Sequence, residues 1–117
     1  MRLNEIEYNG ATPVDGYGPG FFRIGGEKVE GPVITGPTGT RAWAGLSDRA
    51  PLKELAAHID VLFLGTGADV THLPDGLAEE LQEAGIGVEA MSSPAACRTY
   101  NVLLSEGRRV AIALLPV

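Results

Sequence analysis

The stretch Asp60–Ala68, DVLFLGTGA, combines a short apolar run with a glycine loop that is suited to ligand binding. The apolar residues Val61–Leu64 are followed directly by Gly65, Thr66 and Gly67. Glycines let a chain turn sharply and leave backbone amides free to face a ligand. The run is typical of a strand buried on both faces, and open α/β sheets bind ligands at the carboxyl ends of such strands. The loop is therefore a candidate site for a small anion or another polar ligand.

This loop does not match the dinucleotide-binding fingerprint. The fingerprint requires a third glycine at position 70, which is Val70, and a helix that starts directly after the loop. The next helix is expected to begin only near Pro74, so no helix N-terminus points at the loop. We exclude a Rossmann-type nucleotide site, and the alternative to an anion site is a tight turn that merely needs glycine.

A second candidate is the segment Ser92–Asn101, SSPAACRTYN, which places a cysteine in the first turn of a predicted helix. Ser92 and Ser93 can cap this helix, whose positive dipole end would face the edge of the sheet. The dipole and the adjacent Arg98 would both lower the pKa of Cys97, and Asn101 lies one turn further on the same face. Free cysteines are nevertheless most often small core residues, and the neighbouring alanines favour a buried, structural thiol.

The two histidines are weaker candidates. His58 is expected to end a helix, where a cation is favourable. His72 lies in the loop after the glycines, within reach of a ligand bound there, and is a minor candidate for a general base. One cysteine and two distant histidines give no known metal-ligand spacing, so neither a metal nor a cofactor is predicted. We assign no catalytic residue, and an enzyme is the less favoured alternative.

The elements that must position these residues change in character halfway along the chain. Residues 1–46 are β-rich, and frequent Gly and Pro predict the short strands 21–24, 27–30, 32–35 and 40–44. Gly25 and Gly26 predict a hairpin, and the half-buried strand 40–44 should turn Trp43 inward. Both Trp43 and Tyr100 are expected to be buried with their polar atoms hydrogen-bonded.

The second half alternates helices with strands. A short helix capped by Ser47 or Asp48 precedes the strand at 61–64, and Pro74 and Asp75 open a second helix that Gly85 ends. A strand at 86–91, a helix at 95–105 and a strand at 108–115 complete the chain. One helix lies between the strands 61–64 and 86–91, which predicts that these two strands are parallel. Residues 1–117 are therefore expected to form a single α/β domain with an N-terminal β-meander.

Composition narrows the class of protein. A net charge of −6 argues against nucleic acid as a partner. No apolar run approaches the about 20 residues that cross a bilayer, and the N-terminal MRLNEIEYNG lacks the apolar segment of a signal peptide. A single cysteine fits a reducing compartment, so a cytoplasmic protein is predicted.

The charges are segregated along the chain. Residues 61–90 contain no Lys or Arg but six acidic residues, whereas Arg98, Arg108 and Arg109 are accompanied after residue 90 only by Glu106. The simpler explanation is a solvated acidic helix followed by a basic tail. The alternative is a polarised surface that selects a partner by charge.

Several segments together resemble the Mth-type domain family, most specifically ACRTYN followed by EGRRVA. GYGPGFFRIGG, the strand that ends in GTG and LPDGLAEELQEAGIGVEAM extend the likeness over nearly the whole chain. The family includes a mitochondrial respiratory complex I assembly factor and an adipogenesis-associated Mth-domain protein, and its bacterial and archaeal members are mostly uncharacterised. The resemblance implies a three-layer α/β fold around a mixed five-stranded sheet whose last strand is antiparallel to the others.

For function, the resemblance implies a non-enzymatic cytoplasmic module that binds another protein during assembly of a membrane respiratory complex. Neither the identity of that partner nor an oligomeric state follows from the sequence. The alternative is a small-molecule or anion-binding protein, an enzyme included, with its site between the loop Gly65–Ala68 and the helix start at Ser92–Asn101.

Overall fold

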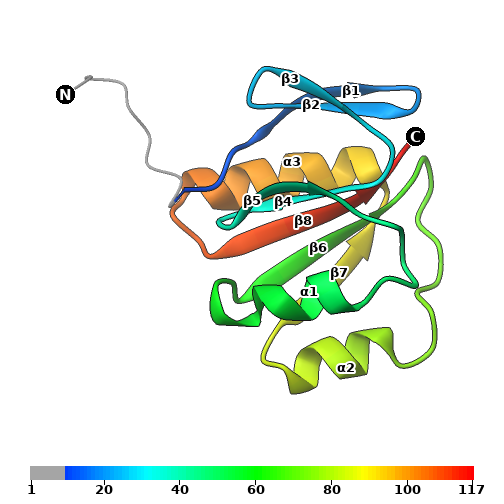
Figure 1. The fold of residues 1–117 in the computed structure, drawn as a ribbon, viewed down its shortest axis with the longest axis vertical. Helices are drawn as coiled ribbons and strands as arrows, with labels where there is room; N and C mark the ends of the chain where they lie inside the picture. Colours follow the sequence, from blue (N-terminus) through cyan, green and yellow to red (C-terminus); the bar gives the residue numbers. More distant parts are fainter. Residues whose placement is uncertain (1–9) are drawn as a thin grey trace.

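The computed structural model describes residues 10–117 and contains two β-sheets (Figure 1). The three-stranded sheet, in the order β1-β2-β3, is an antiparallel meander of Val14–Gly18, Phe21–Ile24 and Glu27–Glu30. The five-stranded sheet has the order β5-β4-β8-β6-β7, and its strands are Val33–Gly36 (β4), Gly39–Ala42 (β5), Val61–Thr66 (β6), Gly87–Met91 (β7) and Val110–Leu115 (β8). The expectation about a signal peptide falls almost entirely outside the described residues.

The direction of the last strand differs from the expectation. β8 is parallel to β6, and β6 is parallel to β7, whereas β4 is antiparallel to both of its neighbours, β5 and β8. The implied antiparallel last strand is therefore wrong. The connection from β7 through a helix to β8 is a crossover, and such connections join parallel strands. The mixed character of the sheet, which was also expected, comes from β4.

Two hydrophobic cores lie on opposite faces of the five-stranded sheet and give the domain three layers. The helix α3 (Ser93–Ser105) and the three-stranded sheet cover one face, while α1 (Ala50–Lys53), η1 (Glu54–Ala57) and α2 (Leu77–Glu83) cover the other (Figure 1). Strands β6 and β8 lie inside the sheet and are buried on both faces, as the apolar run at residues 61–64 predicted. The predicted mixed α/β architecture is confirmed.

At the starts of α1 and α2 the structure differs from what the local sequence predicts. The N-cap of α1 is Arg49, which makes no side-chain cap, so the expected cap by Ser47 or Asp48 is wrong. The carboxylate of Asp48 instead accepts a hydrogen bond from the amide of Ala44. The helix α2 begins at Leu77 and not at Pro74, because Gly76 adopts a left-handed conformation (φ 79°) that separates the preceding turn from the helix. Ser92 caps α3 as expected, by accepting a hydrogen bond from the amide of Ala95.

The two large aromatic residues behave as predicted. Trp43 is buried and its Nε1 donates to the carbonyl oxygen of Asp48 at 2.9 Å. Tyr100 is fully buried and its hydroxyl donates to the carbonyl oxygen of Thr12 at 2.9 Å. The strand before Trp43 is wholly exposed rather than half-buried, and β5 lies at the edge of its sheet.

None of the helices found in residues 10–117 has the length and apolar character needed to cross a membrane.

Candidate functional site

The glycine loop and the start of α3 lie side by side at the carboxyl end of β6. The amide of Gly67 donates to Oγ of Ser93 at 2.9 Å, and the amide of Ser93 donates to the carbonyl oxygen of Gly67 at 2.7 Å. Oγ of Ser93 in turn donates to the carbonyl oxygen of Leu115 at 2.6 Å. These three residues, which we call the Ser93 junction, tie the ends of β6, α3 and β8 together. The two predicted site elements are therefore adjacent.

The neighbouring residues Gly65 and Thr66 also make close contacts within the protein. The hydroxyl of Thr66 donates to the carbonyl oxygen of Asp69 and accepts a hydrogen bond from the amide of Thr71. At Gly65 a Cβ would lie 2.9 Å from Cα of Ser93 and 2.7 Å from a methyl group of Leu114. Glycine is thus required here because a helix approaches the strand closely. Hydrogen bonds within the protein already occupy the hydroxyl groups of Thr66 and Ser93 and the amide of Gly67, and ligand binding at this loop stays a prediction.

Two of the predicted ligand-binding residues do not join this junction. The side chain of Asn101 pairs with the backbone of Val14, accepting from its amide at 2.9 Å and donating to its carbonyl oxygen at 2.8 Å. Asn101 therefore fastens α3 to the first strand of the meander. Arg98 is exposed and borders a surface hollow on α3. The structure brings together Gly65, Thr66, Gly67, Ser92 and Ser93, and it places Arg98 and Asn101 in other surroundings.

Cys97 lies in the core beneath α3. The side chain is buried among Phe63, Ala96 and other apolar residues of the core. Burial raises the pKa of the Cys97 thiol to about 11, and the charge of the adjacent Arg98 offsets only part of this effect. A thiol in such surroundings is protonated at neutral pH and is a poor nucleophile.

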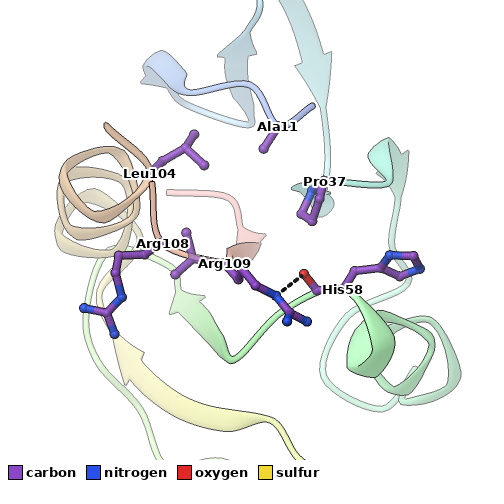
Figure 2. Close-up of a pocket in the computed structure, with 7 residues that line it drawn as sticks. Ala11, Pro37, His58, Leu104, Arg108 and Arg109 are labelled. Atoms are coloured by element: carbon purple, nitrogen blue, oxygen red, sulfur yellow. Dashed lines mark hydrogen bonds between the residues drawn. The ribbon is translucent and has the colours of Figure 1, made fainter. Parts of the chain in front are cut away.

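Neither histidine makes a hydrogen bond to the residues of the Ser93 junction. His72 is exposed in the loop after the glycines, and no hydrogen bond connects its side chain to another described residue. His58 ends η1 and borders a small apolar depression of about 20 Å³ (Figure 2). Nε of Arg109 donates to the carbonyl oxygen of His58 at 3.3 Å, so this guanidinium caps the short helix. The depression has the volume of about one water molecule and is too small for a metabolite.

The outer face of α3 has a different character. Arg98, Thr99, Val102 and Leu103 line an open hollow of about 240 Å³, and Val102 is 55% exposed. We call these four residues the α3 outer face. None of the predictions from the sequence concerned this surface. A signal was present, because Val102 lies four residues after the exposed Arg98 and therefore on the solvent side of an amphipathic helix.

Acidic residues of the segment 61–90 are mostly solvated. Asp69, Asp75, Glu79, Glu83 and Glu89 are exposed, and none forms an ion pair with another described residue. Glu80 differs, because it accepts ion-pair hydrogen bonds from Arg49 at 2.9 Å and from Lys53 at 3.1 Å. These two contacts hold the pKa of the Glu80 carboxyl below its usual value.

Comparison with known sequences identifies the relatives of the chain. Residues 14–115 match the model of a family described as protein of unknown function (DUF498/DUF598). The chain belongs to this family. An uncharacterised protein of Rhodobacter capsulatus is 50% identical over 100% of the chain and 94% of that protein. A second relative, NADH dehydrogenase [ubiquinone] 1 alpha subcomplex assembly factor 3 of Danio rerio, is 37% identical over 99% of the chain and 71% of that protein.

Solved structures of family members have the same fold. A protein described as an outer membrane protein from Bartonella henselae superposes with a TM-score of 0.83 and 36% identity, over 93% of this chain and 98% of that one. A Mth938-like domain of Bordetella pertussis superposes with a TM-score of 0.79 and 27% identity, over 99% of this chain and 91% of that one. The resemblance to the Mth-type domain family is thereby confirmed.

Proposed function

We propose that this protein is a non-catalytic assembly factor, which binds another protein while a membrane-bound NADH dehydrogenase is put together. The observation that carries the proposal is the relationship to the assembly factor of Danio rerio, which extends over 99% of the chain. A binding role without catalysis is consistent with the buried, protonated Cys97 and with polar loop residues that are hydrogen-bonded within the protein. We place this role in the cytoplasm, on the basis of the single cysteine and the composition.

The α3 outer face is the surface that we assign to partner binding. Arginine is enriched in protein interfaces, and here Arg98 borders the same hollow as Val102, an apolar side chain that is 55% exposed. Arg98 makes no ion pair with another described residue, so its charge is available to an acidic group of a partner. The opposite face of α3 is fully committed to the core, which leaves this face for binding.

The test is genetic and uses a matched pair of variants. In the native cell, deletion of the gene should reduce the amount of intact NADH dehydrogenase, seen on native gels and as NADH oxidation by membranes. The wild-type gene and Val70→Glu should restore the complex, whereas Val102→Glu should not. Val70 is 63% exposed in the loop before α2 and thus controls for the introduction of a surface charge.

Normal assembly of the complex in the deletion strain would overturn the assembly role. Equal restoration by the two glutamate variants would instead remove only the assignment of the α3 outer face. Thermal denaturation of both purified variants, with midpoints close to the wild type, is required so that misfolding does not mimic lost binding.

A small-molecule site is the second candidate, because the Gly65–Ala68 loop and the start of α3 lie side by side at the carboxyl end of β6, where open α/β sheets bind ligands. A thermal-shift screen with phosphate and small carboxylates tests it, because a ligand that binds the native state raises the melting temperature. A shift that disappears in Ser93→Ala would support this candidate, whereas no shift with any of these anions would count against it.

A further inference from the structure

The described part of the chain has four strands at sheet edges, and three of them carry a feature that discourages pairing with another chain. In β1 the register is irregular between Val14 and Gly16, and Asn101 occupies backbone groups of Val14. Lys28 lies in β3 and Arg41 in β5. Irregular register and basic side chains are among the means by which proteins protect exposed edges from pairing. The remaining edge strand, β7, has a regular register and no basic side chain, and its one charged residue is Glu89.

The free side of β7 presents unpaired backbone groups. The amide of Gly87 donates to the carbonyl oxygen of Asp60 at 2.8 Å, which directs the backbone of Gly87 toward β6. Backbone direction alternates along a strand, so Val88 and Ala90 direct their N–H and C=O groups away from β6. No hydrogen bond to these groups from elsewhere in residues 10–117 is present. The outer edge of β7 therefore has backbone N–H and C=O groups that are free to pair with another strand.

The side chains of β7 add a charge to this ladder. Val88 and Ala90 pack against the core under α1 and α2, while Glu89 lies exposed on the opposite face of the sheet. Glu89 forms no ion pair with any described residue. Residues 61–90, which supply β6, α2 and β7, contain no Lys or Arg, so these three elements offer no cation to Glu89.

We propose that the edge of β7 binds an extended segment of a partner protein, which adds a sixth strand to the sheet and places a basic side chain opposite Glu89. Main-chain hydrogen bonds to Val88 and Ala90 would supply the affinity in this mode of recognition. The pair between Glu89 and the basic side chain would supply selectivity, because opposite charges across a strand pair are stabilising and like charges are not. The inference is independent of the assembly role, since it concerns a different surface from the α3 outer face.

A second copy of this chain is a poor occupant of the same edge. Two-fold symmetric pairing of β7 about its middle residue would set Glu89 opposite Glu89 of the other copy. Like charges directly opposite one another destabilise a strand pair. The charge that favours a basic segment therefore disfavours self-association.

The experiment uses the full chain labelled with ¹⁵N and capped peptides that alternate threonine and valine around one central residue. With lysine at the centre, titration should shift the amide signals of Val88 and Ala90 and slow their hydrogen exchange. A peptide with glutamate at the centre should bind about two- to fivefold more weakly, as expected for one cross-strand charge pair. A lysine peptide that is N-methylated at alternate positions should not bind, because it cannot complete the ladder.

Variants of the protein then locate the selectivity. Glu89→Gln should remove the preference for the lysine peptide, and Glu30→Gln in β3, an exposed acid on another edge strand, should leave it unchanged. Failure of the lysine peptide to shift β7 amides would overturn the proposal, as would equal affinities of the lysine and glutamate peptides for the wild type. Concentration-dependent protection of β7 amides in the protein alone would overturn it in favour of self-association.

Discussion

The two sides of α3 use their side chains in opposite ways. On the inner side, Ser93, Tyr100 and Asn101 place every polar atom in a hydrogen bond to the backbone of a distant strand or loop. On the outer side, Arg98 and Val102 contact solvent around an open hollow. Polar residues that attract attention in a sequence can therefore hold a fold together, while an ordinary valine marks the surface that is available to a partner.

The difference between the two sides of α3 follows from the free-energy cost of leaving buried polar groups unpaired. A buried donor or acceptor without a partner costs about 1–3 kcal/mol, so polar residues inside a helix packing surface are retained where they satisfy the backbone. An exposed apolar residue costs little in the monomer, and it becomes favourable when a partner covers it. The two sides predict different responses to mutation.

The largest expected effect is at the Ser93 junction. Ser93→Ala should lower the free energy of unfolding by about 2–4 kcal/mol, because it leaves the amide of Gly67 and the carbonyl of Leu115 unpaired in a buried site. Ser92→Ala is the control, and loss of this partly exposed N-cap should cost about 1 kcal/mol. Urea denaturation measures both. Equal losses for the two variants would show that the junction is not what stabilises this end of the sheet.

The second prediction concerns the close approach of α3 to β6. Gly65→Ala should cost about 1–3 kcal/mol, because its Cβ would lie 2.9 Å from the backbone of Ser93 and the helix must move away. Gly87→Ala, in the neighbouring strand, meets nothing closer than 3.4 Å and should change stability by less than about 0.5 kcal/mol. Unfolding curves in urea that are indistinguishable for these variants would contradict the requirement for glycine at Gly65.

These inner contacts also show how far the sequence could predict the structure. The apolar run at 61–64, the hairpin at Gly25 and Gly26, and the ends of α3 are local signals, and the structure confirms them. The hydrogen bonds from Asn101 to Val14 join residues that are 87 positions apart, so no local sequence pattern could predict them. The direction of β8 also depends on pairing with distant strands, and here the connection through α3 was a better guide than the resemblance.

The candidate site was only partly predictable for the same reason. Adjacency of Gly67 and Ser93 followed correctly from parallel strands that end at the same edge of the sheet. Whether Ser93 faces a ligand or Leu115 depends on tertiary packing, which cannot be predicted from the spacing of residues along the chain. The exposure of Val102 likewise required knowledge of which helix face the meander and the sheet cover.

The third prediction uses the pKa of Cys97. Burial raises the pKa of this thiol from 9.0 to about 11 in the folded protein, so well below pH 9 both the folded and the unfolded state are protonated and stability is unaffected. Above pH 9 the unfolded chain loses the proton first, and the free energy of unfolding should fall by about 1 kcal/mol between about pH 8 and pH 10. Cys97→Ala should remove this part of the alkaline loss. An unchanged alkaline loss in the variant would assign the effect to other groups.

The same thiol should react slowly with an alkylating reagent at neutral pH. Iodoacetamide labelling of the folded protein is expected at the rate of a buried thiol, and Arg98→Ala should slow it only slightly, because burial has the larger effect on the pKa of the thiol. Labelling faster than that of a free cysteine, abolished by Arg98→Ala, would reverse this conclusion and favour an enzyme.

The smallest expected effect is on the outer side of α3. Val102→Ser should change the free energy of unfolding by less than about 0.5 kcal/mol, because a side chain that is 55% exposed contributes little to the core. Leu104→Ser, two residues later on the buried side, should cost several times more, since Leu104 is buried in the core beside Tyr100. Chemical denaturation of the two variants therefore compares the two sides of one helix directly. A large loss for Val102→Ser would mean that Val102 stabilises the monomer, and the case for a binding surface on α3 would fail.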